Sequence, residues 1–279
     1  MLKIATDVTA DLPTELANQH QIHIFHNWVY LKTGRCKTDE VEIADLFNLL
    51  IDEVGKSRTA PLSEDEYYQS FCDLTSNGDS LILVAPSRGA SPLYDTAQKA
   101  AADLPQVYVH DSRGLSLVQG FQAIRAAQMA AAGKSVEEII RVLDQMAQSA
   151  QFLCVLENLS YLRHGGRVNM AQYLLGSMLV LKPVITLTDG RVIPVSRVRT
   201  FDRALDEMQQ RMQAQIEKLP DLWLGVMHSQ APEAAQTFAK KLKAAFNPAY
   251  MLVTEARANV AIHGGPGAVG LVACSAYEA

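Results

Sequence analysis

The sequence predicts an α/β protein of two domains, a parallel-sheet α/β/α domain followed by an α/β domain with a mixed sheet. Three observations lead to this prediction. Val- and Ile-rich runs alternate with amphipathic stretches over Lys3–Ala150, which is typical of strand and helix units around a parallel sheet. Further on, Asp189-Gly190 separates two apolar runs, which indicates an antiparallel hairpin. The length of 279 residues fits roughly two domains.

The first domain, residues 1–155, is predicted from short apolar strands and from helix-start signals. Apolar residues at helical spacing predict a helix over Glu42–Val54. Ser63 and Ser135 each precede a Glu by three residues, the capping-box pattern, and Ala-rich periodicity extends over Leu115–Ala132 and Ser135–Ser149. The predicted strands are Lys3–Thr6, Ile24–Leu31, Ser80–Val84 and Val107–His110.

The second domain, residues 156–279, is predicted to contain antiparallel pairing around the hairpin Pro183–Thr188 and Arg191–Val195. No Gly-, Ser- or Pro-rich linker marks the boundary near residue 155, so we expect the two halves to pack closely. Helices are expected at Ala171–Leu181, Phe201–Leu219 and Pro232–Phe246. Strands are expected at Trp223–Met227, Met251–Thr254, Val260–Ile262 and Leu271–Cys274.

Composition excludes several classes of function. With 25 basic and 30 acidic side chains the net charge is −5, which argues against a nucleic-acid partner. The four cysteines stand far apart, so neither a disulfide framework nor a metal site is expected. The sequence shows no signal-peptide pattern and no run of ~20 apolar residues. We therefore expect a cytoplasmic protein without stable membrane insertion.

Polar loops follow three strands of the first domain. They are Thr6–Thr9, Ser87–Ser91 and Asp111-Ser112. Because ligands bind outside the carboxyl ends of parallel strands, these loops are expected to converge on one site. The alternative is that their side chains only cap helices and satisfy loop backbone.

A glycine cluster lies near the C-terminus, at His263–Gly270. Gly265–Gly270 has the spacing G-x-G-x-x-G, but the nucleotide-binding motif needs a strand before it and a helix after it. Leu271–Cys274 has the pattern of a strand instead, so we reject the hypothesis that this segment binds a nucleotide. Glycines allow positive-φ turns and close approach, which would hold His263 at a fixed position.

Ser91 and His263 also suggest an esterase-type hydrolase. A nucleophile elbow needs G-x-S-x-G, and here the second glycine is missing. Pro92, which follows Ser91, has no N–H to offer an oxyanion hole. The hydrolase is kept as an alternative, together with a binding module for another small anion.

Seven ordered motifs resemble those of the DegV family of bacterial fatty-acid-binding proteins, the acyl-carrying subunits of fatty acid kinase. They cover nearly the whole chain. The motifs are Thr6–Pro13 (T-D-V-T-A-D-L-P), Ser87–Tyr94, Asp111-Ser112 with Ser116, Leu156–Val168, Lys182-Pro183 with Asp189-Gly190, Val198–Thr200, and His263–Ala268.

The resemblance implies a protein that is not itself an enzyme and has no catalytic residues, no metal and no cofactor. It would bury one long-chain fatty acid at the domain junction and present the carboxylate to a dihydroxyacetone-kinase-like kinase subunit, as a step of phospholipid metabolism. Ser91, His263 and Thr59 would bind the carboxylate, with Ser57 as the alternative to Thr59. Two hydroxyls and an imidazole N–H suit a carboxylate, which only accepts hydrogen bonds.

The resemblance also assigns Arg167 and Arg199 to contact with the kinase partner or the phosphate. The alternative for both is a surface arginine in helix-end salt bridges. Three residues depart from the family pattern: Pro92 replaces Gly, Leu93 replaces Thr, and Gly264 replaces Thr. Fewer head-group donors are therefore expected here than in the family.

Overall fold

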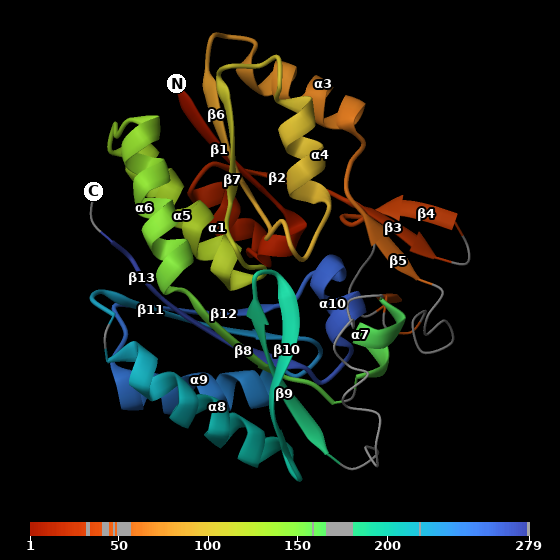
Figure 1. Cartoon of the computed structure of the whole chain (residues 1–279), viewed down its shortest axis with the longest axis vertical. Coiled ribbons are helices and arrows are strands. Elements are labelled where there is room, and N and C mark those ends of the chain that lie inside the picture. Colours follow the sequence, from red (N-terminus) through yellow and green to blue (C-terminus); the bar gives the residue numbers. More distant parts are fainter. Residues whose placement is uncertain are drawn as a thin grey trace.

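The computed structural model describes residues 1–31, 34–40, 45–46, 48, 57–157, 159–165, 181–217 and 219–277. Two large sheets lie one above the other, with helices between them and on their outer faces (Figure 1). None of the helices in these ranges is long and apolar enough to cross a membrane.

The first large sheet is parallel throughout, as predicted, in the order β2-β1-β6-β7. Helices α3 (Glu64–Thr75) and α4 (Leu93–Ala100) pack on one face. Helices α1 (Thr14–Gln19), α5 (Leu117–Ala131) and α6 (Val136–Ser149) pack on the other. Its strands are β1 (Leu2–Asp7), β2 (Ile22–Phe25), β6 (Ser80–Ala85) and β7 (Val107–Asp111).

Both predicted capping boxes are present. The hydroxyls of Ser63 and Ser135 each accept the N–H of the glutamate three residues on, Glu66 and Glu138. Each glutamate carboxylate accepts the serine N–H in return. Two backbone N–H groups at the start of each helix, which have no partner within the helix, are thereby hydrogen-bonded.

The predicted strand Ile24–Leu31 is wrong as a single element. It divides into β2 and β3 (Trp28–Leu31), which belong to different sheets. The break falls at Asn27, whose buried amide donates to the Asp7 carboxylate at 2.5 Å. A side chain held in this way turns the chain out of the first sheet, and the apolar pattern alone does not reveal it.

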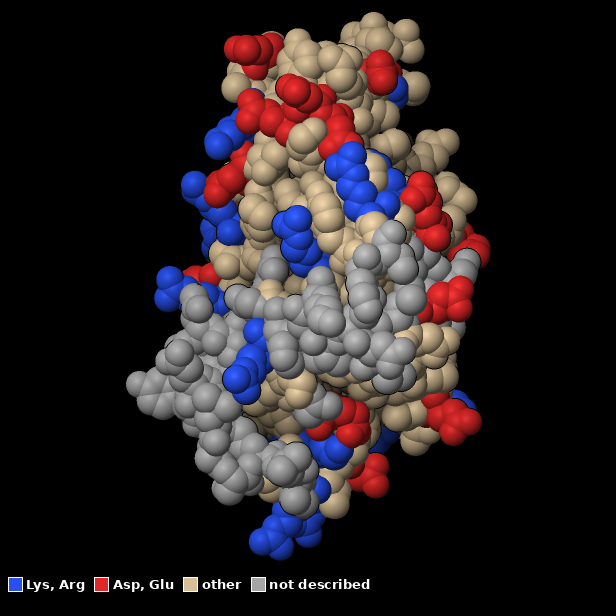
Figure 2. Space-filling view, turned by 90° about the vertical axis from the view of Figure 1, so that its right-hand side faces the viewer, with Lys and Arg blue, Asp and Glu red and all other residues tan. Residues whose placement is uncertain are grey.

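A small antiparallel sheet, in the order β4-β3-β5, lies beside the two large ones (Figure 1). It contains β4 (Gly34–Lys37) and β5 (Arg58–Ala60). Its inner face buries Val29 against Met227 and Ile262. Its outer face belongs to the side seen in Figure 2, where basic and acidic side chains both occur.

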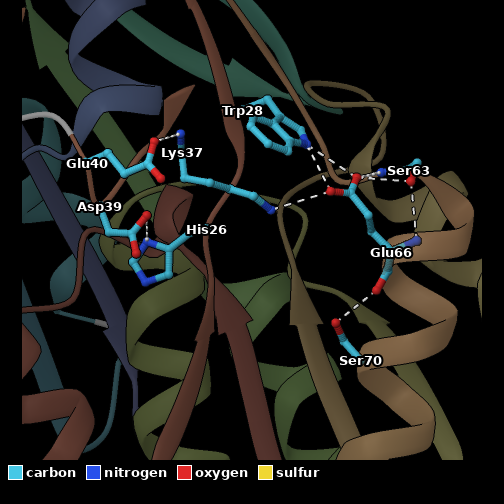
Figure 3. A network of polar contacts seen from close by, with 8 residues as sticks. All are labelled: His26, Trp28, Lys37, Asp39, Glu40, Ser63, Glu66 and Ser70. Atoms are coloured by element: carbon cyan, nitrogen blue, oxygen red, sulfur yellow. Dashed lines mark hydrogen bonds and ion pairs between the residues drawn. The ribbon is translucent and has the colours of Figure 1, made fainter. Parts of the chain in front are cut away.

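Glu66 fastens the small sheet to α3. Its carboxylate accepts the Trp28 indole N–H at 3.2 Å and lies 3.5 Å from the Lys37 ammonium (Figure 3). The same carboxylate accepts the N–H and hydroxyl of Ser63. One side chain thus begins α3 and also fixes the sheet that carries β5.

The second large sheet is mixed, in the order β10-β9-β8-β13-β11-β12. Only β11 and β12 run parallel within the described pairings; the predicted hairpin is β9 and β10. Helices α8 (Phe201–Ile216) and α9 (Pro232–Phe246) cover its outer face. The strands are β8 (Gln151–Val155), β9 (Lys182–Thr188), β10 (Arg191–Val198), β11 (Leu222–His228), β12 (Tyr250–Glu255) and β13 (Val269–Ser275).

The predicted strand Val260–Ile262 is wrong, because this segment lies in helix α10 (Ala258–Gly264). β-branched residues favour strands, but tertiary packing overrides that preference. Ala258, Ala261 and Ile262 recur at helical spacing and bury one face of α10 against Met227.

Two predicted helices cannot be compared fully with the structure. Ala171–Leu181 lies outside the described residues except for its last position, and most of Glu42–Val54 lies outside them as well. The described helices that the sequence analysis did not predict include α1, α4, η1 (Val8–Ala10) and α7 (Ser160–His164).

Helix α5 lies between the two large sheets and is buried almost all round. One hydrophobic cluster joins Ile4 and Ile82 of the first sheet to Val272 of the second through this helix. Phe121 meets the rings of Trp223 and Tyr250 edge-on, with centroids 5.5 and 5.9 Å away. The halves therefore pack closely, as the missing linker suggested.

A buried polar network closes the end of β1. Asp7 accepts hydrogen bonds from the Thr9 hydroxyl at 2.6 Å, the Asn27 amide at 2.5 Å and the Gln119 amide at 2.7 Å. Burial raises the Asp7 pKa, and these hydrogen bonds oppose the rise. The network joins β1 to β3 and α5.

Asp11 continues the network toward α10. Its carboxylate accepts the Arg257 N–H at 2.7 Å, and its carbonyl accepts the Thr254 hydroxyl at 2.9 Å. Burial raises the pKa of Asp11 to about 7, against the opposing effect of the Arg257 N–H and guanidinium. A carboxyl that titrates near neutrality therefore connects the first sheet to the second half.

Replacing Phe121 with Ala should destabilise both halves together. The change removes a fully buried ring between the two sheets and should cost about 3–5 kcal/mol of unfolding free energy. Urea unfolding, followed by tryptophan fluorescence and by circular dichroism, measures this loss. Ser135→Ala removes only a helix cap and should cost about 1 kcal/mol. Two separated transitions in the wild type would contradict the shared core.

Asp11→Asn should flatten the dependence of stability on pH. Burial raises the pKa of Asp11 in the folded protein above its value in the unfolded chain. Protonated Asp11 therefore favours folding below about pH 4, and this contribution to stability is lost as the pH rises through about 7. Asn still accepts the Arg257 N–H but does not ionise. Between pH 5 and pH 8 the wild type should lose roughly 2–3 kcal/mol more unfolding free energy than the variant. Equal losses in urea titrations at the two pH values would contradict this assignment.

Candidate functional site

A cavity of about 260 Å³ lies between the carboxyl ends of the first sheet and the inner face of the second. This is close to the lower end of the range for small-molecule sites, about 300–1,000 Å³. Residues from both halves of the chain line it. Its polar side chains are Thr9, Thr59, Ser91, Ser229, Asn259 and His263, together with the charged Arg191. Its apolar wall includes Phe152, Cys154, Leu156, Leu162, Ile185 and Leu187.

Thr59 and His263, 204 positions apart in the sequence, meet in this cavity. The Thr59 hydroxyl lies 3.4 Å from His263 Nε2. Thr59 is placed by β5, where it pairs with the buried Val29 of β3 and therefore faces inward. His263 occupies the last turn of α10, which ends at the positive-φ Gly265. Two of the three predicted carboxylate-binding residues are thus in contact.

Glycine at position 165 leaves room for the His263 ring. A Cβ there would overlap His263 Nδ1, so any larger residue would displace the imidazole. Gly165 ends α7, and α7 and α10 pack against each other. Gly165, which belongs to the Leu156–Val168 motif, therefore helps to set the position of the histidine, a role that spacing alone does not indicate.

Ser91 lines the same cavity from the loop after β6. Its Oγ accepts the Leu93 N–H at 3.3 Å in the first turn of α4. Among the described interactions no hydrogen bond joins Ser91 to His263. An activated serine nucleophile needs such a bond to its base, so the geometry does not favour the hydrolase alternative.

The hairpin turn of β9 and β10 covers the Ser91 loop. A Cβ on Gly89 would overlap the Asp189 carbonyl oxygen, and a Cβ on Gly190 would overlap the backbone of Gly89 and Ala90. Gly190 also has a φ of +72°, which side chains disfavour. The two backbones therefore touch directly, and this contact forms one wall of the cavity.

Ser57 and Arg199 do not join this group in the structure. Ser57 is buried but is not among the described lining residues, so Thr59 is the residue that reaches the cavity. Arg199 is exposed just before α8 and does not line the cavity. Arg167 lies outside the described residues.

The three departures from the family pattern have different surroundings. Pro92 precedes α4, and Leu93 is buried in the core beneath that helix. Gly264 lines the cavity, and a Cβ there would only touch Ala268, at 3.7 Å. Because Gly264 has no side chain, space in the cavity remains open next to His263.

Sequence reasoning missed Ser229 and Asn259 as lining residues. Ser229 directly follows β11, the same signal that indicated the polar loops of the first sheet. Asn259 lies four residues before His263, on the same face of α10. It was missed because its neighbours were predicted to form a strand.

The lining of the cavity combines polar and apolar side chains. Hydroxyl and imidazole groups line it together with apolar side chains from β8, β9 and α7. Burial raises the pKa of the Cys154 thiol in the apolar wall to about 12, so it remains neutral. No metal-binding group of three His, Cys, Asp or Glu occurs within the described ranges.

Comparison with known proteins gives consistent matches over the whole length. A protein named DegV from Bacillus subtilis is 27% identical over 280 residues, which is 98% of this chain and 99% of that protein. A DegV domain-containing protein from Streptomyces coelicolor is 31% identical over 277 residues, 98% of each chain.

Solved structures agree with the fold described above. A DegV family protein from Thermus thermophilus, described in terms of fatty acid binding, matches with a TM-score of 0.92 and 26% identity over 98% of this chain and 99% of that one. Bacillus subtilis DegV, described as a fatty acid binding protein, matches with a TM-score of 0.87 and 26% identity over the same shares. A family model described as "Uncharacterised protein, DegV family" covers residues 1–276, and the chain therefore belongs to the DegV family.

Proposed function

We propose that this protein binds one long-chain fatty acid in the cavity between its two large sheets. The observation that carries the proposal is that one cavity is lined both by hydrogen-bonding side chains, Thr59, Ser91 and His263, and by apolar side chains of β8 and β9, with Thr59 and His263 in contact. The similar proteins from Thermus thermophilus and Bacillus subtilis, both described as binding fatty acids, support it.

The two ends of the cavity would contribute differently to binding. Thr59, Ser91 and His263 would donate hydrogen bonds to the carboxylate, and such charge-assisted bonds are the stronger sort. Each buried methylene contributes ~0.8 kcal/mol, so fourteen would give on the order of 11 kcal/mol before the cost of association. The tail would supply affinity, and the polar end would set the position of the carboxylate.

We further propose that the protein is a carrier in the cytoplasm rather than an enzyme. It would present the bound carboxylate to a dihydroxyacetone-kinase-like subunit for phosphorylation, in phospholipid metabolism. The ordered family motifs support this role. Arg167 and Arg199 are the proposed partner or phosphate contacts, and Arg199 is exposed as that role requires. The domains would meet near residue 155, with the ligand at their junction.

Native mass spectrometry of the gently purified protein tests the binding proposal. The expected result is a single added mass that corresponds to a C14–C18 fatty acid, released on denaturation. Protein that arrives empty and takes up no added oleate would contradict the proposal.

Ser91→Ala should weaken fatty acid binding about 10- to 100-fold, because a hydrogen bond to a charged group contributes about 1.5–3 kcal/mol. Displacement of a fluorescent fatty acid measures the change. Thr96→Ala is the matched control, since its hydroxyl bonds Pro92 on the same helix and does not line the cavity. Equal affinity of both variants would remove Ser91 from the site.

Arg199→Ala should leave fatty acid affinity within about 2-fold of wild type, because the side chain does not line the cavity. Transfer of phosphate to the bound acid by the partner kinase should fall at least ~10-fold, the effect of losing a charged contact. Arg203→Ala, a nearby helix residue, is the control. Unchanged phosphorylation of the Arg199 variant would contradict the proposed contact.

A further inference from the structure

Two polar side chains of the cavity have no hydrogen-bond partner in the described part of the chain. They are Ser229, only 1% exposed, and Asn259, whose amide oxygen is buried. By contrast, Thr9 is bonded to Asp7, and Ser91 accepts the Leu93 N–H. Buried polar groups in native proteins are almost always hydrogen-bonded, so an occupant of the cavity is the natural partner of both.

Both side chains belong to the His263 end of the cavity. Asn259 lies one helical turn before His263 on the same face of α10. The Ser229 N–H donates to the Ala268 carbonyl at 2.9 Å, and its carbonyl accepts the Gly267 N–H at 2.7 Å. Ser229 is therefore bound to the glycine loop that follows His263. Most of the large apolar lining residues come from other elements, β8, β9 and α7, while Met227 of β11 and Val260 of α10 also line the cavity.

The atoms involved restrict what the occupant can be. With the Asn259 amide oxygen facing the occupant, an ionised carboxylate has no hydrogen to donate to it, and methylene groups bond neither side chain. A hydroxyl group both donates and accepts. It suits Asn259 in either orientation of the amide, and it suits the Ser229 hydroxyl as well.

The charge of the lining favours a neutral group at this place. Arg191 is the one charged residue among the described lining residues, and it belongs to the β9–β10 hairpin. Met227 and Val260, which also line the cavity, are apolar neighbours of Ser229 and Asn259 in the sequence. A second carboxylate or a phosphate would find no cation on α10 or β11 among these residues.

We propose that Ser229 and Asn259 form a second polar subsite that receives a hydroxyl group near the carboxylate of the ligand. The preferred ligand is then a 2- or 3-hydroxy fatty acid. This inference rests on the proposed fatty acid function and names the substrate class of the same cavity. Because the subsite adjoins His263, a hydroxyl far along the chain would miss it and meet the apolar wall.

Competition binding with the full-length protein tests the inference. The probes are hexadecanoate, 2-hydroxyhexadecanoate, 3-hydroxyhexadecanoate and 12-hydroxyhexadecanoate, each displacing a fluorescent fatty acid. The 2- or 3-hydroxy acid should bind ~10-fold more tightly than hexadecanoate, the effect of one or two added hydrogen bonds. The 12-hydroxy acid should bind more weakly than hexadecanoate.

Substitutions at Ser229 and Asn259 test whether the preference for a hydroxyl group arises at these two residues. Ser229→Ala and Asn259→Leu should each reduce the preference for the near-carboxylate hydroxyl, measured as the ratio of hydroxy acid to hexadecanoate affinity in the same variant, to about 2-fold or less. Leu187→Ala, in the apolar wall, should weaken all four acids alike. Thermal unfolding of each variant checks that it is folded. The comparison of the four acids with wild-type protein does not depend on any variant.

Equal binding of hexadecanoate and both near-carboxylate hydroxy acids by the wild type would overturn the inference and leave the fatty acid function standing. Retention of the hydroxyl preference in both variants would also overturn it. Failure of all four acids to bind would overturn the proposed function together with the inference.

Discussion

Burial of helix α5 between the two large sheets is the constraint on which the rest of the structure depends. A helix buried over most of its surface must be covered on both flanks, and each large sheet supplies one cover. The sheets are therefore held at a fixed separation, and the carboxyl ends of β1 and β6 face the inner surface of the second sheet. The cavity lies in the space beyond the start of α5, so its place follows from the packing of that one helix.

The polar side chains around this space are held by interactions outside it. Glu66 fixes the small sheet and thereby β5 with Thr59. The Asp7 and Asp11 network joins β1 to α5 and to the residue before α10, the helix that carries His263. Each group that faces the cavity is thus attached to a buried or multiply bonded support. Such support reduces the entropy lost when a ligand binds, which is the physical meaning of a preformed site.

Much of this architecture could be predicted from local sequence signals. The capping boxes of Ser63 and Ser135 and the Asp189-Gly190 hairpin are short-range patterns whose geometry depends on neighbours in the chain. The meeting of Thr59 with His263 came from the family resemblance, because nothing in the residues near Thr59 indicates a partner 204 positions away.

Predictions failed where a distant contact outweighed local preference. Asn27 interrupts an apolar run because Asp7 binds it, and Val260–Ile262 is helical because Met227 and its neighbours cover one face. The second error also hid Asn259, since a strand would hold it about 13 Å from His263, whereas one turn of α10 brings the two close together. Ser229 could have been found, because it follows an apolar strand just as Ser87 does.

The contact between Gly89 and Gly190 has a consequence for how the family can diversify. One boundary of the cavity is set by main chain against main chain, and no side chain there can grow without pushing the two halves apart. The positions free to vary are the apolar residues of β8 and β9 and open points such as Gly264. Substitutions at those positions would alter which molecules fit while the frame keeps its dimensions. Selectivity and foldability can therefore evolve separately in this protein.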